Sequence, residues 1–204
     1  MSVLVLPMPD SGCGEKPPAY HPPKARLPVE IVYDLVCPWC FLGVRRLVRT
    51  MRRRPDLLFD LTWRPFLLNP DMPRAGMARP DYIIRKFGGE DRARRLYSSI
   101  SEIGRAEGVL FHFERIRRAP SSVDAHRLVR FARRHGQADA IVEALFSAHF
   151  TDGQDIGEAA VLVRIAQDCG LDGAAAEEFL TGAPPGENTW GVCIVLRKIP
   201  VTRG

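Results

Sequence analysis

The chain has 204 residues, a formal net charge of +5 and a hydrophobic fraction of 46%. This length fits one domain, or one domain with a large insertion, and supplies a sizeable core. No stretch approaches the ~18 uncharged apolar residues of a membrane-spanning helix, which argues against a membrane protein. The arginines that carry the charge are mixed with acidic residues and have no aromatic residues between them, so no nucleic-acid surface is expected.

The first 28 residues are rich in proline and show little periodicity. Their prolines are Pro7, Pro9, Pro17, Pro18, Pro22, Pro23 and Pro28. This composition predicts a disordered leader over residues 1–28. The apolar start has no basic residue before it and no small-residue cleavage site after it, so we expect no signal peptide and a cytoplasmic location.

Residues 29–74 carry a strand–helix–strand pattern. In VEIVYD, Val29, Ile31 and Tyr33 alternate with Glu30 and Asp34, and Val32 makes the segment mostly apolar, which predicts a short strand. After the two cysteines, apolar residues recur at helical spacing until Pro55, and LLFDLTWRPF then returns to a period of two. This order predicts a βαβ unit with parallel strands.

Residues 75–181 show helical periodicity throughout. The expected helices end at Gly88, Gly108, Gly136 and Gly170. Glycine is a common helix stop because it adopts positive φ at little cost. We therefore expect an all-helical block here, followed by an atypical tail over residues 182–204.

Cys37 and Cys40 lie between the first strand and the first helix, in YDLVCPWCFLGV. Pro38 suits the first helical position, which leaves Cys37 at or next to the N-cap. The unpaired amides of Trp39 and Cys40 and the positive end of the helix favour a thiolate at Cys37, so we expect a depressed pKa there. Cys40, one turn further and expected to be more buried, would stay a thiol and act as the resolving partner.

Two other interpretations of this cysteine pair stay open. A zinc site would need two further ligands at knuckle-like spacing, whereas Cys169 and Cys193 lie 24 positions apart. Two inert core cysteines would need a proline and a tryptophan packed between them at a strand end. Trp39 would shield the sulfurs if the pair is redox-active, and would be an ordinary core residue if the two cysteines are inert.

Several segments resemble the DsbA-like thioredoxin-fold family, and in particular its cytoplasmic FrnE-type branch. They are DLVCPWCFLG, WRPFLLNPDMP, AHRLVRFA and ALFSAHFTDGQDIGE, within residues 28–180. The resemblance implies an α/β fold with a thioredoxin-like βαβ start over residues 29–74 and a helical domain inserted over residues 75–181. It also implies that Cys37 and Cys40 are the catalytic pair, and that Asn69 lines the substrate groove unless it is a plain turn residue.

The function that this resemblance implies is exchange of a CxxC dithiol or disulfide with thiols of substrate proteins, with glutathione as a further thiol partner and no cofactor. The alternative is a glutathione-dependent isomerase or transferase of the kappa type, although such relatives carry serine in place of Cys37. Members of the family close their sheet with a Gly-Val-Pro segment and two antiparallel strands, which residues 182–204 do not match. We therefore expect the C-terminal half-sheet to be missing, and an inactive truncated fragment is a third interpretation.

Overall fold

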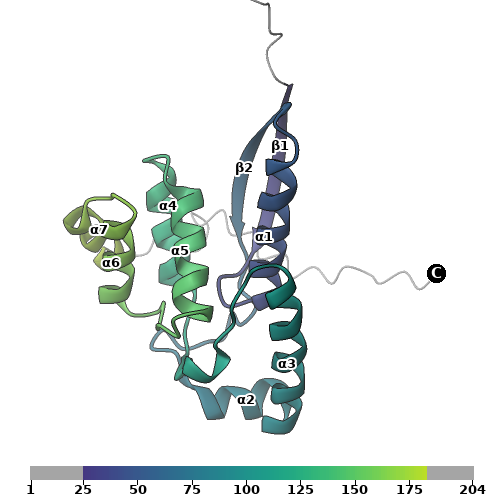
Figure 1. The fold of residues 1–204 in the computed structure, drawn as a ribbon. Coiled ribbons are helices and arrows are strands. Elements are labelled where there is room, and N and C mark those ends of the chain that lie inside the picture. Colours follow the sequence, from purple (N-terminus) through teal and green to yellow (C-terminus); the bar gives the residue numbers. More distant parts are fainter. Residues whose placement is uncertain (1–24, 183–204) are drawn as a thin grey trace, which may run out of the picture.

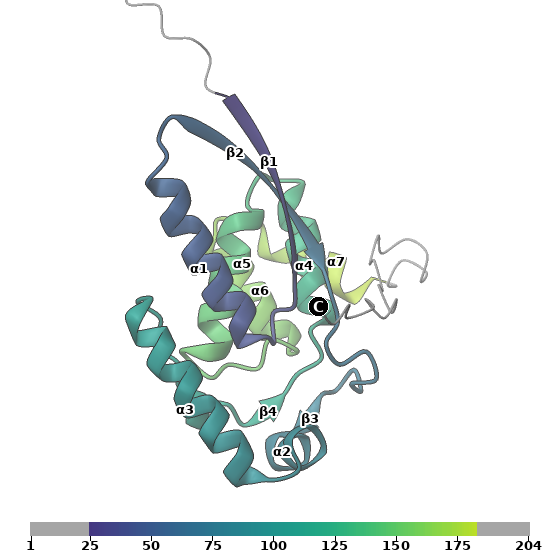
Figure 2. The same cartoon turned by 90° about the vertical axis from the view of Figure 1, so that its right-hand side faces the viewer.

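The chain starts with a βαβ unit in the computed structural model, which describes residues 25–182. Strand β1 (Ala25–Tyr33) leads to helix α1 (Pro38–Arg52) and strand β2 (Leu57–Pro65). The two strands pair in parallel, with Tyr33 opposite Pro65. This arrangement confirms the predicted βαβ unit, and Figure 2 shows the twisted strand pair beside α1.

The first strand starts earlier than predicted. Residues 25–28 belong to β1 rather than to the expected leader, of which residues 1–24 lie outside the described range. Pro28 lies inside the strand, opposite Asp60 of β2. A proline is tolerated at this position because no other strand within residues 25–182 pairs with the second edge of β1.

After β2, the described chain is mainly helical, as predicted. Its elements are β3 (Met77–Ala78), α2 (Arg79–Phe87), α3 (Glu90–Ala106), the 3-10 helix η1 (Phe113–Arg115), β4 (Arg118–Ala119), α4 (Val123–Arg133), α5 (Ala138–Phe150), α6 (Ala159–Asp168) and α7 (Gly173–Thr181). The expected all-helical block therefore needs one correction, since β3 and β4 form a short antiparallel pair. Strands of two residues are too short to show a period in the sequence.

The predicted glycine stops are found at the ends of four helices. Gly88 is the C-cap of α2, with φ of 74°, and its N–H donates to the carbonyl of Ile84 at 2.9 Å. Gly108, Gly136 and Gly170 follow α3, α4 and α6 and also have positive φ. Each helix end thus lies within three residues of the predicted stop.

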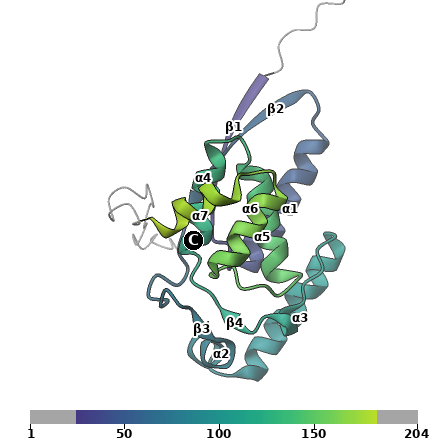
Figure 3. The same cartoon turned by 90° about the vertical axis from the view of Figure 1, so that its left-hand side faces the viewer.

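One apolar core joins the βαβ unit to the helices. Phe41 of α1 stacks on Phe146 of α5, with ring centroids 5.1 Å apart, and also lies against Phe150. Trp63 of β2 donates its indole N–H to Asp139 at 2.7 Å. Figure 1 shows α4 and α5 beside the strands, and Figure 3 shows α6 and α7 on the outer side of α4 and α5. The segments expected over residues 29–74 and 75–181 therefore share their core.

The expected missing half-sheet falls mostly on residues 183–204, which lie outside the described range. Within residues 25–182, β1 and β2 form a two-stranded sheet. Apolar side chains are exposed on this sheet, with Val32 at 61% and Leu27 at 45%. None of the helices in this range is both long enough and apolar enough to cross a membrane.

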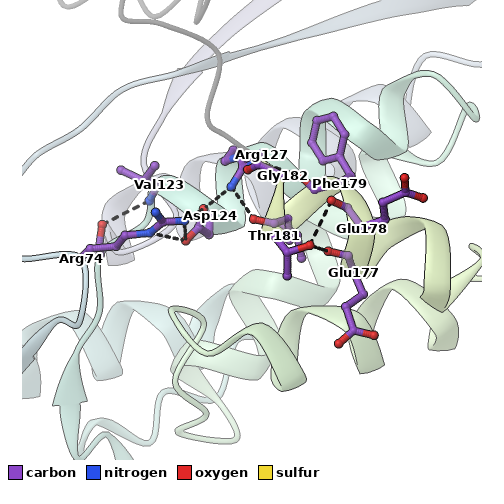
Figure 4. Close-up of polar contacts among 11 residues, drawn as sticks. Arg74, Val123, Asp124, Arg127, Glu177, Glu178, Phe179, Thr181 and Gly182 are labelled. Atoms are coloured by element: carbon purple, nitrogen blue, oxygen red, sulfur yellow. Dashed lines mark hydrogen bonds and ion pairs between the residues drawn. The ribbon is translucent and has the colours of Figure 1, made fainter.

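A buried arginine of α4 fixes the end of α7. Arg127 is 2% exposed and donates hydrogen bonds to the backbone carbonyls of Phe179, Leu180 and Gly182 at 2.6–2.8 Å. Its guanidinium also donates to Asp124 at 2.9 Å. Figure 4 shows Arg127 between this carboxylate and the last turn of α7. Because the last carbonyls of a helix have no partner within it, Arg127 supplies the missing donors.

Candidate active site

The turn that carries the two cysteines has the predicted helix-start geometry. Cys37 is the N-cap of α1, in an extended conformation, and Pro38 occupies the first turn. The N–H of Cys37 donates to the carbonyl of Asp34 at 3.0 Å, and the N–H of Cys40 donates to the carbonyl of Cys37 at 3.0 Å. Residues three apart at a helix start lie on the same side, so the two thiols are neighbours, and both are free.

The pKa of Cys37 is lowered from 9.0 to about 7. The largest cause is a hydrogen bond from the Cys40 thiol, and the backbone amides of Cys40 and Trp39 add to it. Burial and the negative charge of Asp34 act in the opposite direction. At pH 7 about half of the Cys37 side chains are then thiolate, against about one in a hundred at a pKa of 9.

Cys40 behaves as the proton-holding partner of Cys37. Its pKa is raised, first because its thiol hydrogen-bonds to Cys37 and then because it is buried. The expected difference in burial between the two thiols is not found, since both side chains are half-buried. The two thiols therefore differ in pKa mainly because of the hydrogen bond between them, and not because one is more exposed than the other.

Asp34 is a buried carboxylate directly before the cysteine turn. It is 1% exposed and accepts hydrogen bonds from the backbone N–H groups of Leu68 at 2.7 Å and Val36 at 3.3 Å. Nε2 of His126, from α4, lies 3.4 Å from its Oδ1. Burial raises the pKa of Asp34, but His126, the Leu68 amide and the Ser122 hydroxyl outweigh this effect and lower it. An ionised Asp34 thus ties the cysteine turn to both α4 and the loop after β2.

A cavity of about 150 Å³ opens beside Cys37. Three of the four residues predicted for the site line it, namely Cys37, Trp39 and Asn69. Cys40 does not line the cavity and instead packs against the apolar core. Trp39 is 49% exposed, which agrees with a position at the rim of the cavity rather than in the core.

Asn69 is held by side chains of α2, a helix that also lines the cavity. Its Oδ1 accepts a hydrogen bond from Nζ of Lys86 in α2 at 3.1 Å, and it also bonds to the hydroxyl of Tyr82. Arg79, at the start of α2, lines the same cavity. The lining of the cavity therefore combines two cations with polar side chains, and a role of Asn69 in substrate binding stays a prediction.

The sequence interpretation missed three residues of this region, namely Asp34, His126 and His149. Asp34 was assigned to the polar side of a strand, although an acidic residue just before a CxxC turn is itself a signal. His126 and His149 lie in the AHRLVRFA and ALFSAHFTDGQDIGE segments, which carry the family resemblance and the helical periodicity but do not show what either histidine faces. Among residues 25–182, no group of three His, Cys, Asp or Glu side chains is placed to hold a metal ion.

The remaining thiols lie away from this turn or outside the described range. Cys169 is the C-cap of α6 and is half-buried, and burial together with the nearby Asp168 raises its pKa. Cys13 and Cys193 fall in residues 1–24 and 183–204, which the structure does not describe. Within the described part, only the Cys37–Cys40 turn thus joins a lowered thiol pKa to a cavity.

Comparison with known proteins agrees with this fold. The model of the DSBA-like thioredoxin domain family matches residues 28–187. An uncharacterized protein of Bacillus subtilis, YwbO, is 24% identical over 152 residues, which cover 74% of this chain and 70% of the relative.

Solved structures show the same similarity. A probable DsbA oxidoreductase from Streptomyces coelicolor is 25% identical with a TM-score of 0.68, covering 76% of this chain and 68% of that one. The cytosolic disulfide reductase DsbM from Pseudomonas aeruginosa is 18% identical with a TM-score of 0.54, covering 76% and 69%. Because the family model covers most of the sequence, the chain belongs to the DSBA-like thioredoxin domain family.

Proposed function

We propose that this protein is a thiol–disulfide oxidoreductase that exchanges a Cys37–Cys40 dithiol or disulfide with protein substrates. The observation that carries the proposal is Cys37 itself, which is the N-cap residue of α1, has a thiol pKa of about 7 and lines a cavity. Membership of the DSBA-like family and the similarity to oxidoreductases support it. The similarity to a cytosolic reductase also supports a cytoplasmic location.

In the first step, the Cys37 thiolate attacks one sulfur of a substrate disulfide. A Cys37–substrate disulfide forms, the substrate S–S bond breaks, and the leaving thiolate takes a proton from water. Cys37 has then lost the negative charge that accepts the Cys40 hydrogen bond, so the main cause of the raised pKa of Cys40 disappears.

In the second step, Cys40 loses its proton to water and its thiolate attacks the Cys37 sulfur. A Cys37–Cys40 disulfide forms, the mixed disulfide breaks, and the second substrate thiolate leaves and is protonated. Two electrons have passed from the protein to the substrate. Two molecules of a small thiol, which become one disulfide, return the pair to the reduced state.

Glutathione is a small thiol whose carboxylates match the charge of the cavity lining. Arg79 and Lys86 line the same cavity as Cys37, and Arg85 lies with Lys86 in an adjoining depression. These cations match the carboxylates of an acidic thiol peptide. The Pseudomonas aeruginosa DsbM has also been solved with GSH. We also propose that the chain belongs to the FrnE-type branch of the family.

A turnover assay tests the proposed exchange. The test chain carries Cys13→Ser, Cys169→Ser and Cys193→Ser, so that only the proposed pair remains, and it is mixed with insulin and reduced glutathione. We expect insulin reduction well above the uncatalysed rate. The matched control is the same chain after full alkylation with iodoacetamide, and equal rates for the two would refute the proposal.

A further inference from the structure

A histidine from the helical domain lines the same cavity as Cys37. His149 lies in the last turn of α5, is 4% exposed, and packs its ring against that of Phe150 at 4.6 Å. Its position in the chain is 112 residues after Cys37. The mechanism above gives no task to this side chain.

The hydrogen bond of His149 defines which nitrogen carries the proton. Nδ1 lies 3.3 Å from the backbone carbonyl oxygen of Gln154, and a carbonyl can only accept, so Nδ1 bears the hydrogen. Burial lowers the pKa of His149 to about 4, which keeps the ring neutral at neutral pH. Nε2 is then a bare acceptor.

His149 lines the cavity beside Cys37, and its second ring nitrogen is Nε2. The hydrogen bond of the ring to the Gln154 carbonyl is made by Nδ1, which leaves Nε2 as the second ring nitrogen. The fully enclosed side-chain nitrogens without a partner include both ring nitrogens of His126 but not Nε2 of His149. His149 lines the cavity beside Cys37, and Nε2 is the ring nitrogen that is available to a ligand there.

General-base catalysis does not explain this nitrogen. A thiol with the ordinary pKa of 9.0 would transfer its proton to a base of pKa about 4 only about once in 10⁵ encounters. An acceptor of hydrogen bonds fits better, because much of the cavity wall is apolar, including Val36, Ile100 and Phe113. In such apolar surroundings an acceptor such as Nε2 is left without a partner, so a hydrogen bond from a substrate donor stabilises the complex.

We propose that His149 is a substrate-binding residue whose Nε2 accepts a hydrogen bond from a backbone N–H beside the reacting half-cystine of a peptide disulfide. The inference rests on the proposed function. Because Cys37 and His149 line the same cavity, of about 150 Å³, a donor that reaches Nε2 lies near the sulfur that meets Cys37. The N–H of the half-cystine itself, or of the residue after it, meets this condition in every peptide.

Two variants separate the binding role of His149 from a structural one. In His149→Asn, the side-chain amide can keep the bond to the Gln154 carbonyl, but no atom reaches the former position of Nε2. In His149→Gln, the longer side chain returns an oxygen to that position. Melting temperatures of both variants report any loss of fold.

The substrates form a matched pair, with oxidised glutathione carrying backbone N–H groups and 3,3′-dithiodipropionate carrying carboxylates but no N–H. We expect His149→Asn to lower kcat/KM about tenfold for oxidised glutathione, mainly through KM, and to leave dithiodipropionate unchanged. His149→Gln is expected to restore most of the loss. Equal losses with both substrates, or no loss with either, would overturn the inference. If the parent chain turned over neither disulfide, the proposed function itself would fail, and the inference with it.

Discussion

The Cys40→Ala variant is expected to remain covalently attached to its disulfide substrate through Cys37. The first step needs only the Cys37 sulfur, whereas release of the product needs the Cys40 sulfur, so turnover falls to the uncatalysed rate. Loss of the Cys40 hydrogen bond also raises the pKa of Cys37 above about 7. Capture is therefore slower than in the parent at pH 7 and approaches the parent rate near pH 9.

Mass spectrometry without reductant measures this capture, with one substrate peptide expected per chain and its linkage mapped to Cys37. Cys37→Ala is expected to form no complex. Cys169→Ala is the matched control, because Cys169 is also a free, half-buried thiol, and it should retain the parent turnover. Parent-like turnover by Cys40→Ala would show that Cys40 is not the resolving thiol.

The Arg127→Ala variant is expected to lose about 3 kcal/mol of the free energy of unfolding. The buried guanidinium donates to the carbonyls of Phe179, Leu180 and Gly182, and its removal leaves these groups without their donor. The substitution also removes a hydrogen-bond donor from the carboxylate of Asp124. For a chain of this size the loss corresponds to a decrease of roughly 6–12 °C in the melting temperature.

Urea denaturation followed by circular dichroism measures this loss. Arg133→Ala is the control, because Arg133 lies on the same helix with its side chain exposed, and surface changes of this kind stay within about 0.5 kcal/mol. Arg127→Met keeps more apolar volume but supplies no donor, so it should also be destabilising. A parent-like free energy of unfolding in both Arg127 variants would contradict the role of this hydrogen-bond cluster.

The cysteine turn could be predicted from the sequence because its causes are local. Cys37 precedes Pro38, proline favours the first helical turn, and the structure places the N-cap at Cys37. The parallel pairing of β1 and β2 follows in the same way from short-range periodicity and one crossover helix. In each of these elements, the residues that determine the conformation are close neighbours in the chain.

The rest of the candidate site depends on contacts between residues far apart in the chain. His126 reaches Asp34 across 92 positions, and His149 lines the cavity of Cys37 from another helix. Helical periodicity places both histidines on helices but gives no information on which element they face. The equal burial of Cys37 and Cys40 was missed for a related reason, since burial depends on how the helical domain packs against α1.

The acidity of Cys37 can be measured directly as the pH dependence of its alkylation by iodoacetamide. The chain with Cys13→Ser, Cys169→Ser and Cys193→Ser is suitable, with the modified site identified by mass spectrometry. We predict that the rate at Cys37 rises with a midpoint near pH 7, as expected for its lowered pKa. A midpoint near pH 9, the ordinary value, would contradict an attacking thiolate at this helix start.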